Sequence, residues 1–458
     1  MNNHKRVLWF VVIITSSLFL LSLLSAFFSI ENEALKNISI VSDIFHQPKQ
    51  SIEAVKQTID TLVIVESKNT LDSSSVKKKF KLYQTPNRIT NYAIDSSAIA
   101  LPKFIKKLEE LQKGKRKKIR IAFLGDSMIE DDLITQTFRT LMQQRFGGYG
   151  VGFLPISYPV ANGRTTATIS ASGNWREINF RNNTDKTTLF ISGRSFFATG
   201  HSVTEIVDKT AKNNLPLQKY LLYGKTAAAD VVANGKQIKI AATVNFSSIL
   251  LDSSSSNKIK LDVNNQMPLF GVSLESPHGI IVDNFSFRGN SGTDFAKMDS
   301  TFLQSIAANH SYDLIVLQYG VNIFEKATDE NFDWYSNPMK KSIQKLKACF
   351  SNADILLMST ADRSFRYGTE YKTAKGMNAL LYLQQKIAFE SGISFYNTFM
   401  SIGGEGSMVN WVNSKPPLAY KDFMHPNSLG SAIIGRSLFQ SVLNEYQKII
   451  NTTENHKR

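Results

Sequence analysis

The stretch IRIAFLGDS at residues 119–127 joins a short apolar run to a glycine turn that carries Ser127. A nearly continuous apolar run of this length is typical of a buried strand. The following residues, 129–146, have a helical pattern that Gly147 and Gly148 end. We therefore expect a strand–turn–helix unit in which Ser127 lies just past the carboxyl end of the strand.

Similar patterns recur on both sides of this unit. Pro102 suits the first turn of a helix that Gly114 ends. Apolar strands alternate with helical patterns after residue 279, and a last helix is expected after His425. This alternation predicts an α/β fold with a parallel sheet covered by helices on both faces. The expected strands are 279–282, 314–317 and 355–358, and the expected helices are 293–309, 335–350 and 371–391.

The pattern between Val151 and about Ile281 is different. Short β-rich runs, such as 165–169, 188–191 and 238–241, are separated by Asn, Ser and Gly. Many short strands with turn residues between them are typical of a β-sandwich or jelly roll. We expect such a domain to be inserted after the first helix of the α/β domain.

The amino-terminal segment predicts an attachment to a membrane. Residues 7–30 carry no charge and follow Lys5 and Arg6, and a bilayer-spanning helix needs ~20 apolar residues. Basic residues before the span keep the N-terminus in the cytoplasm. We expect an uncleaved, single-pass signal anchor with the rest of the chain outside the cytoplasm, in the periplasm or cell envelope. A cleaved signal peptide is the alternative.

Net charge limits the kinds of partner that we expect, and cysteine content limits the cross-links and metal sites. The net charge is +15, and basic runs occur at 77–81 and 115–118. An exported chain meets little nucleic acid, so we expect no such partner. Anionic lipid or an acidic wall polymer could bind these runs, but solvated surface is their commoner role. Cys349 is the only cysteine, which excludes an intramolecular disulfide and a cysteine zinc cluster.

These observations divide the chain into six parts. The expected parts are a cytoplasmic tip with the membrane helix (1–30), a stalk (31–100), the first α/β segment (101–153), the inserted β domain (154–278), the second α/β segment (279–450) and a polar tail (451–458).

The segment Asp422-Phe423-Met424-His425-Pro426 supplies a carboxylate three residues before a histidine. A serine hydroxyl becomes a good nucleophile when an imidazole accepts its proton, and a carboxylate orients that imidazole. Asp422 at this spacing can bond Nδ1 of His425 and leave Nε2 free for Ser127. Singly, Ser127 could be an ordinary N-cap and His425 a structural histidine. Together they suggest acyl transfer through a serine ester.

Two further strand ends offer hydrogen-bond donors. Gly289 lies in the turn Gly289-Asn290-Ser291-Gly292, and Asn322 follows the strand that ends near Gln318. A backbone N–H and a side-chain amide are suitable donors to the oxyanion of a tetrahedral intermediate. Turns that merely favour Gly and Asn are the alternative.

Two other groups of residues have simpler interpretations. Glu130, Asp131 and Asp132 are adjacent acids that could suggest a metal site, but at a helix start they are more often complements of the helix dipole. Four aromatic residues of the insert could stack on sugars, although a sandwich core is the commoner place for such side chains. These aromatic residues are Trp175, Phe190, Phe196 and Phe197.

In chain order, these motifs resemble the four blocks of the SGNH (GDSL-type) hydrolase family. The resemblance covers about 101–153 and 279–446 and implies a flavodoxin-like parallel sheet. It implies that Ser127 is the nucleophile, His425 the base and Asp422 its orienting carboxylate. It also implies an oxyanion hole made by Ser127, Gly289 and Asn322, with no metal or organic cofactor.

A narrower likeness concerns residues 125–153, which resemble bacterial peptidoglycan O-acetylesterases that carry a carbohydrate-binding-like β insert at this place. Met128 stands where those relatives often have histidine. Ile323 follows Asn322 where many family members have aspartate.

The resemblance implies a serine esterase that removes O-acetyl or similar short acyl groups from a cell-envelope glycan such as peptidoglycan. One alternative is an O-acyltransferase that acylates an envelope polysaccharide with a membrane-bound O-acyltransferase partner. A second alternative is a glycan-binding protein without catalytic activity.

Overall fold

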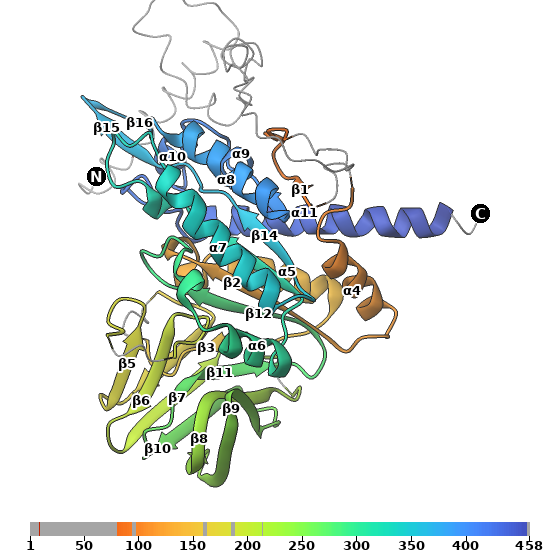
Figure 1. Cartoon of the computed structure of the whole chain (residues 1–458), viewed down its shortest axis with the longest axis vertical. Helices are drawn as coiled ribbons and strands as arrows, with labels where there is room; N and C mark the ends of the chain where they lie inside the picture. Colours follow the sequence, from red (N-terminus) through yellow and green to blue (C-terminus); the bar gives the residue numbers. More distant parts are fainter. Residues whose placement is uncertain are drawn as a thin grey trace, which may run out of the picture. The chain divides into compact units, whose positions relative to one another are not determined.

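The computed structural model describes residue 9 and residues 80–93, 98–158, 163–184, 188–212 and 214–455. The chain divides into two compact units, residues 1–76 and 77–458. All the elements described below belong to the second unit (Figure 1).

A six-stranded sheet forms the centre of this unit. The first strand in the sheet order, β1, pairs antiparallel with its neighbour, and every other pair is parallel. Numbered along the chain, the parallel strands have the order 2-1-3-4-5 of flavodoxin-like folds. From edge to edge the strands are β1 (Ile89–Asn91), β17 (Ser394–Tyr396), β14 (Asp354–Met358), β13 (Leu314–Gln318), β2 (Lys118–Gly125) and β12 (Gly279–Ser286).

Helices cover both faces of this sheet. Side chains alternate along each strand, so Leu124 of β2 belongs to one core and Phe123 to the other. The first core contains residues of α6 (Ser300–Asn309), α7 (Asp333–Cys349) and α8 (Met377–Ser391). The second core contains residues of α4 (Pro102–Gln112), α5 (Thr135–Phe146) and α11 (Ser428–Asn455). Shorter elements are η1 (Ser127–Asp132), η2 (Asp294–Lys297), η3 (Val321–Ile323), α9 (Thr398–Ser401), α10 (Ser407–Asn413) and the hairpin of β15 (Ser364–Tyr367) and β16 (Glu370–Thr373).

The insert is one continuous antiparallel sheet of nine strands, not the two separate sheets of the expected sandwich. A single core contains residues from its outer strand β4 through to β6, so the sheet curves around that core in a barrel-like way. Its strands are β3 (Gly152–Leu154), β4 (Ala167–Ala171), β5 (Trp175–Asn179), β6 (Arg194–Ala198), β7 (Ser202–Asp208), β8 (Gln218–Ala233), β9 (Lys236–Asp252), β10 (Lys258–Val263) and β11 (Leu269–Glu275).

An aromatic cluster joins the two sheets. Phe190 stacks on Phe246 and Phe270 of the insert, with ring centroids 5.6 and 5.2 Å away, and meets Phe285 of β12 edge-on at 5.5 Å. Phe270 in turn contacts Phe302 of α6. Phe190 and Phe196 are fully buried, which confirms the core interpretation for these two aromatic residues.

Several local expectations were wrong. The helix expected at 129–146 begins only at Thr135, because Asp131, Asp132 and Ile134 have positive φ. Residues 188–191 form no strand, although Phe190 and Ile191 are buried. The expected helix at 371–391 starts at Met377, since the preceding residues form β16.

The ends of the chain also differ from expectation where they are described. Residues 89–91, in the stretch expected to be a stalk, form β1 and pair with β17 at the sheet edge. Helix α11 continues to Asn455, within the expected polar tail. The expected membrane segment 7–30 lies outside the described residues except for Trp9. Among the helices that the structure describes, none has both the length and the apolar character to cross a bilayer.

Candidate active site

Ser127 lies where β2 ends and η1 begins, at the carboxyl edge of the parallel sheet. Strand order reverses between β2 and its neighbours β12 and β13, and such a switch point is where open α/β sheets hold ligands. Ser127 is 8% exposed, and its Oγ lies 2.8 Å from Nε2 of His425. The structure therefore brings together two side chains that the sequence separates by 298 positions.

Asp422 completes a hydrogen-bonded chain with these two residues. Its Oδ2 lies 2.6 Å from Nδ1 of His425, and its Oδ1 accepts the backbone N–H groups of Met424 and His425 at 3.0 and 3.1 Å. Burial would raise the pKa of Asp422, but these hydrogen bonds more than offset it and leave the pKa below its ordinary value. An ionised Asp422 favours a proton on Nδ1 and leaves Nε2 to accept from Ser127.

Asn322 lies in η3, at the end of the neighbouring strand β13. The turn before it requires glycine, because Gly320 has a φ of +153° and a Cβ there would lie 2.4 Å from Cβ of Thr360. The Asn322 Nδ2 donates to Oδ2 of Asp126 at 3.0 Å and to the carbonyl of Asn290 at 3.3 Å. These contacts connect the Ser127 turn with the turn that follows β12.

Gly289, the remaining expected donor, precedes Asn290 in that last turn. It is exposed and has a φ of +77°, a left-handed conformation that favours glycine. The turn is closed by the N–H of Asn290 on the carbonyl of Phe287 at 3.1 Å. Through Asn290, the Gly289 turn thus reaches Asn322 and lies beside the Ser127 end of the sheet.

Asp126 is a site residue to which sequence reasoning assigned no role. It is fully buried, and its Oδ1 accepts the N–H of Met128 at 2.9 Å while its Oδ2 accepts from Asn322. Burial raises the pKa of Asp126 to about 7 against the opposing effect of these hydrogen bonds. Its place between Gly125 and Ser127 was visible in the sequence, but its contact with Asn322 depends on tertiary structure.

Two of the three acids after Ser127, Glu130 and Asp132, pair with other side chains, and the helix whose dipole they were expected to complement begins only at Thr135. Asp132 binds Arg139 through both carboxylate oxygens, at 2.6 and 2.7 Å, and lies 3.4 Å from Arg164 of the insert. Glu130 pairs with Arg288 and accepts from the hydroxyl of Tyr158 at 3.1 Å. Within the described part of the chain, no cluster of three or more His, Cys, Asp or Glu could hold a metal ion.

The two departures from the family pattern are both buried. Met128 is 1% exposed in the core that contains α5 and α11, and Ile323 is 2% exposed in the opposite core. Both side chains therefore contribute to packing rather than to an open binding surface.

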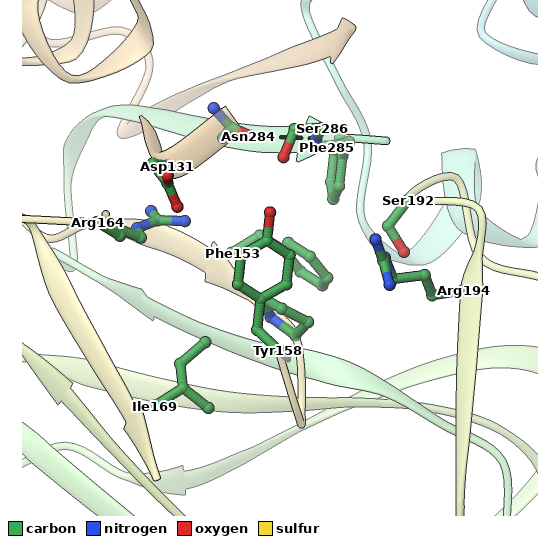
Figure 2. Close-up of a pocket in the computed structure, with 11 residues that line it drawn as sticks. Asp131, Phe153, Tyr158, Arg164, Ile169, Ser192, Arg194, Asn284, Phe285 and Ser286 are labelled. Atoms are coloured by element: carbon green, nitrogen blue, oxygen red, sulfur yellow. Dashed lines mark hydrogen bonds between the residues drawn. The ribbon is translucent and has the colours of Figure 1, made fainter. Parts of the chain in front are cut away.

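A cavity lined by both polar and apolar side chains lies between the insert and the carboxyl end of β12 (Figure 2). It has about 410 Å³ of empty volume, part of it open to solvent. Asp131 Oδ1, Arg164 Nη2 and Ser192 Oγ line it and have no hydrogen-bond partner among the described residues. Its lining does not include Ser127, Asp422 or His425, so it is separate from the hydrogen-bonded chain.

Comparisons with known proteins give a clear likeness in fold. A solved structure of a peptidoglycan O-acetylesterase matches with a TM-score of 0.66 at 21% identity, covering 79% of this chain and 99% of that chain. No protein-family model and no curated protein sequence matches. The resemblance in fold to a peptidoglycan O-acetylesterase, expected from the sequence, is therefore confirmed.

Other solved structures match more weakly. A protein from Bacillus subtilis matches with a TM-score of 0.29 at 14% identity, covering 59% of this chain and 88% of that chain. A family two carbohydrate esterase from Clostridium thermocellum, in complex with cellohexaose, has a TM-score of 0.26 at 10% identity, covering 60% and 98%. Scores this low carry no argument about this chain.

Proposed function

We propose that this chain is a serine esterase that removes O-acetyl groups from a cell-envelope glycan. The observation that carries the proposal is the continuous chain of hydrogen bonds from Ser127 Oγ through His425 to Asp422, with distances of 2.8 and 2.6 Å. The likeness in fold to a peptidoglycan O-acetylesterase supports the choice of an acetylated glycan as substrate.

The proposed reaction follows from the positions of these groups. Ser127 Oγ attacks the acetyl carbonyl carbon while Nε2 of His425 accepts the hydroxyl proton. His425 then gives this proton to the departing sugar oxygen, which leaves an acetyl ester on Ser127. Water attacks that ester while His425 accepts its proton, and His425 then returns the proton to Ser127 Oγ as the ester bond breaks, which releases acetate and regenerates the serine. Asp422 stabilises the imidazolium in both steps.

The negative oxygen of each tetrahedral intermediate needs donors close to Ser127. We assign the backbone N–H groups of Ser127 and Gly289 and the amide of Asn322 to this role. The Asn322 hydrogen that points to the carbonyl of Asn290 makes the longer of its two contacts, at 3.3 Å. That weaker contact is the one an oxyanion would replace, while the contact with Asp126 keeps the amide oriented.

We further propose that residues 7–30 anchor the enzyme in the inner membrane and that the catalytic body faces the envelope. The uncharged run behind Lys5 and Arg6 supports this placement. Cell fractionation with protease protection tests it: a full-length chain that remains soluble without detergent, or a catalytic body protected inside the cytoplasm, contradicts it.

The test of the function compares purified enzyme with Ser127→Ala and with Ser286→Ala as a matched control. Ser286 lies opposite Gly125 in the β12–β2 register, so both substitutions remove one hydroxyl from the same edge of the sheet. We expect the wild type and S286A to release acetate from O-acetylated peptidoglycan, as read by mass spectrometry, and S127A to release none. Acetate release by S127A at the normal rate would contradict the mechanism.

The same assay distinguishes transfer from hydrolysis. An O-acyltransferase would use the same three side chains with a sugar hydroxyl in place of water. With an acyl donor and unmodified glycan present, a net gain of glycan ester identifies transfer, and a net loss from acetylated glycan identifies hydrolysis. Glycan binding without turnover of any ester identifies a protein that only binds.

A further inference from the structure

Arg363, directly before β15, holds the turn that carries Asn322. Its Nη1 donates to the carbonyl of Val321 at 2.6 Å and to that of Phe324 at 2.7 Å, so the two contacts flank Asn322. Its guanidinium also lies over the ring of Phe365, 4.5 Å from the centroid. Three points of contact thus fix this side chain against the η3 turn.

The η3 turn has little internal support. It is a three-residue element in which the N–H of Ile323 donates to the carbonyl of Gly320 at 3.0 Å. The carbonyls at the end of such a short element need outside donors. A guanidinium supplies charge-assisted hydrogen bonds, which are stronger than neutral ones. Arg363 therefore determines where the backbone on each side of Asn322 lies.

The hairpin that follows Arg363 reaches the other half of the site. The N–H of Ser364 donates to the carbonyl of Phe423 at 2.9 Å. The ring of Tyr371, on β16, stacks on Phe423 with centroids 3.8 Å apart and planes within 6°. Phe423 lies between Asp422 and His425 and has a φ of +57°, a conformation that these outside contacts help to hold.

The hairpin also supports the segment after Asn322. The hydroxyl of Tyr367 donates to the carbonyl of Ala327 at 2.7 Å, and Phe365 contacts the ring of Phe324 edge-on. Residues 363–371 are thus the structural link between the Asn322 turn and the Asp422–His425 loop, which are separate in sequence and carry different parts of the proposed reaction.

We propose that Arg363 is a positioning residue that places the Asn322 amide for stabilisation of the oxyanion. The inference rests on the proposed function, because it assigns Arg363 to the same site. Arg363 touches neither substrate nor the reacting atoms in this assignment, and it acts through the backbone of η3.

The kinetic test compares Arg363→Ala with Arg366→Ala. Arg366 is a matched control on the same hairpin, exposed to solvent, with its Nε on the carbonyl of Gly368 at 3.2 Å. A misplacement of about 1 Å at a catalytic group costs up to about 100-fold in rate. We expect R363A to lower kcat on nitrophenyl acetate by about 10- to 100-fold, with KM within about two-fold, and R366A to change neither.

A double-mutant cycle tests whether Arg363 acts through Asn322. If it does, R363A lowers the rate of the Asn322→Ala enzyme much less than it lowers the rate of the wild type. Guanidinium ion at non-denaturing concentration should restore part of the activity of R363A and none of N322A. Equal losses in both backgrounds, or an equal effect of R366A, would overturn the assignment.

Hydrogen exchange separates this inference from the proposed function. We expect the peptide that contains residues 320–324 to exchange faster in R363A than in the wild type or R366A, whether or not the chain has esterase activity. Unchanged exchange in that peptide overturns the positioning role. If R363A does not fold, Arg363→Lys, which keeps the charge on a side chain without the planar fork, carries the same comparison with a smaller expected effect.

Discussion

Removal of the charge on Asp132 should strongly destabilise the fold. Asp132 is fully buried, and Arg139, whose side chain is 2% exposed, binds both of its carboxylate oxygens at 2.6 and 2.7 Å. Asp132 also accepts the hydroxyls of Thr135 and Thr166. In Asp132→Asn the guanidinium stays buried without the carboxylate that binds it directly, and Asp208 and Asp283 remain as more distant counter-charges.

The magnitude follows from this burial. Loss of one partner of a buried ion pair costs about 3–5 kcal/mol. A partly exposed pair offers the control: Glu109 of α4 and Lys113, the residue that caps the end of α4, are 2.5 Å apart, with side chains 17% and 50% exposed. Glu109→Gln should cost no more than about 0.5 kcal/mol. The loss of unfolding free energy in D132N and its ratio to the loss in E109Q together test whether burial sets the cost.

The assay is urea unfolding of the full chain, followed by circular dichroism at pH 7. With an m value of about 3 kcal/mol per molar, D132N should lower the midpoint by about 1 M or more, and E109Q by about 0.2 M or less. The double variant Asp132→Leu with Arg139→Met should recover part of the loss, because it removes the buried charge of Arg139, although Arg164 still loses its contact with Asp132. A loss below about 1 kcal/mol in D132N would refute the reasoning.

Acid should remove the same stabilisation. Burial would raise the pKa of Asp132, but the attraction of Arg139 and Arg164 lowers it below its ordinary value. A lowered folded-state pKa gives stability that is present above about pH 3.9 and lost as pH falls further. The gap in stability between wild type and D132N should therefore narrow below pH 4, which acid titration of the unfolding midpoint measures.

Three further outcomes are expected. Asp422→Asn should lower kcat on nitrophenyl acetate by about 100-fold or more, because the imidazole of His425 loses the charge that orients it and stabilises its positive form. A kcat within about two-fold of the wild type would exclude this role of Asp422. The stability of the wild type relative to Asp126→Asn should fall as pH rises from about 4 through about 7. Burial raises the pKa of Asp126 to about 7, and ionisation of this group opposes folding. A difference in urea midpoints that does not change with pH would contradict this prediction. Gly320→Ala should lower the free energy of unfolding by about 1–3 kcal/mol, as measured in a thermal melt, because its Cβ would meet Thr360 at 2.4 Å. Gly368→Ala, at φ +64° with open space around it, is the control that gives the cost of positive φ alone in the same melt.

Much of the central architecture could be predicted from the sequence. The apolar runs in β2, β12, β13 and β14 read as buried strands because parallel strands covered on both faces need no polar alternation. The order of Ser127, Gly289, Asn322 and the Asp-x-x-His motif indicated which strand ends would meet, since carboxyl ends of parallel strands lie at one edge of the sheet.

Other features were hidden because they depend on contacts that form only in the folded chain. Where the expected helix breaks after Ser127, Asp132 binds Arg139 and lies 3.4 Å from Arg164, whereas local patterns favoured a continuous helix. The hairpin of β15 and β16 is exposed and polar, so the alternation of apolar and polar residues that marks a strand was weak there. Its link to the candidate site comes from its contacts with Phe423.

The sequence by itself determined the kind of fold and offered the residue types of the proposed acyl transfer, because strand periodicity and short motifs are properties of neighbouring residues. Only the tertiary structure decided that Nε2 of His425 lies 2.8 Å from the Ser127 hydroxyl. Likewise, only the packed structure showed that Arg363 donates hydrogen bonds to the turn of Asn322 and that Asp126 accepts one from the Asn322 side-chain amide. These contacts join residues between 39 and 298 positions apart in the chain, and the packing of the whole sheet is what brings them within hydrogen-bond distance.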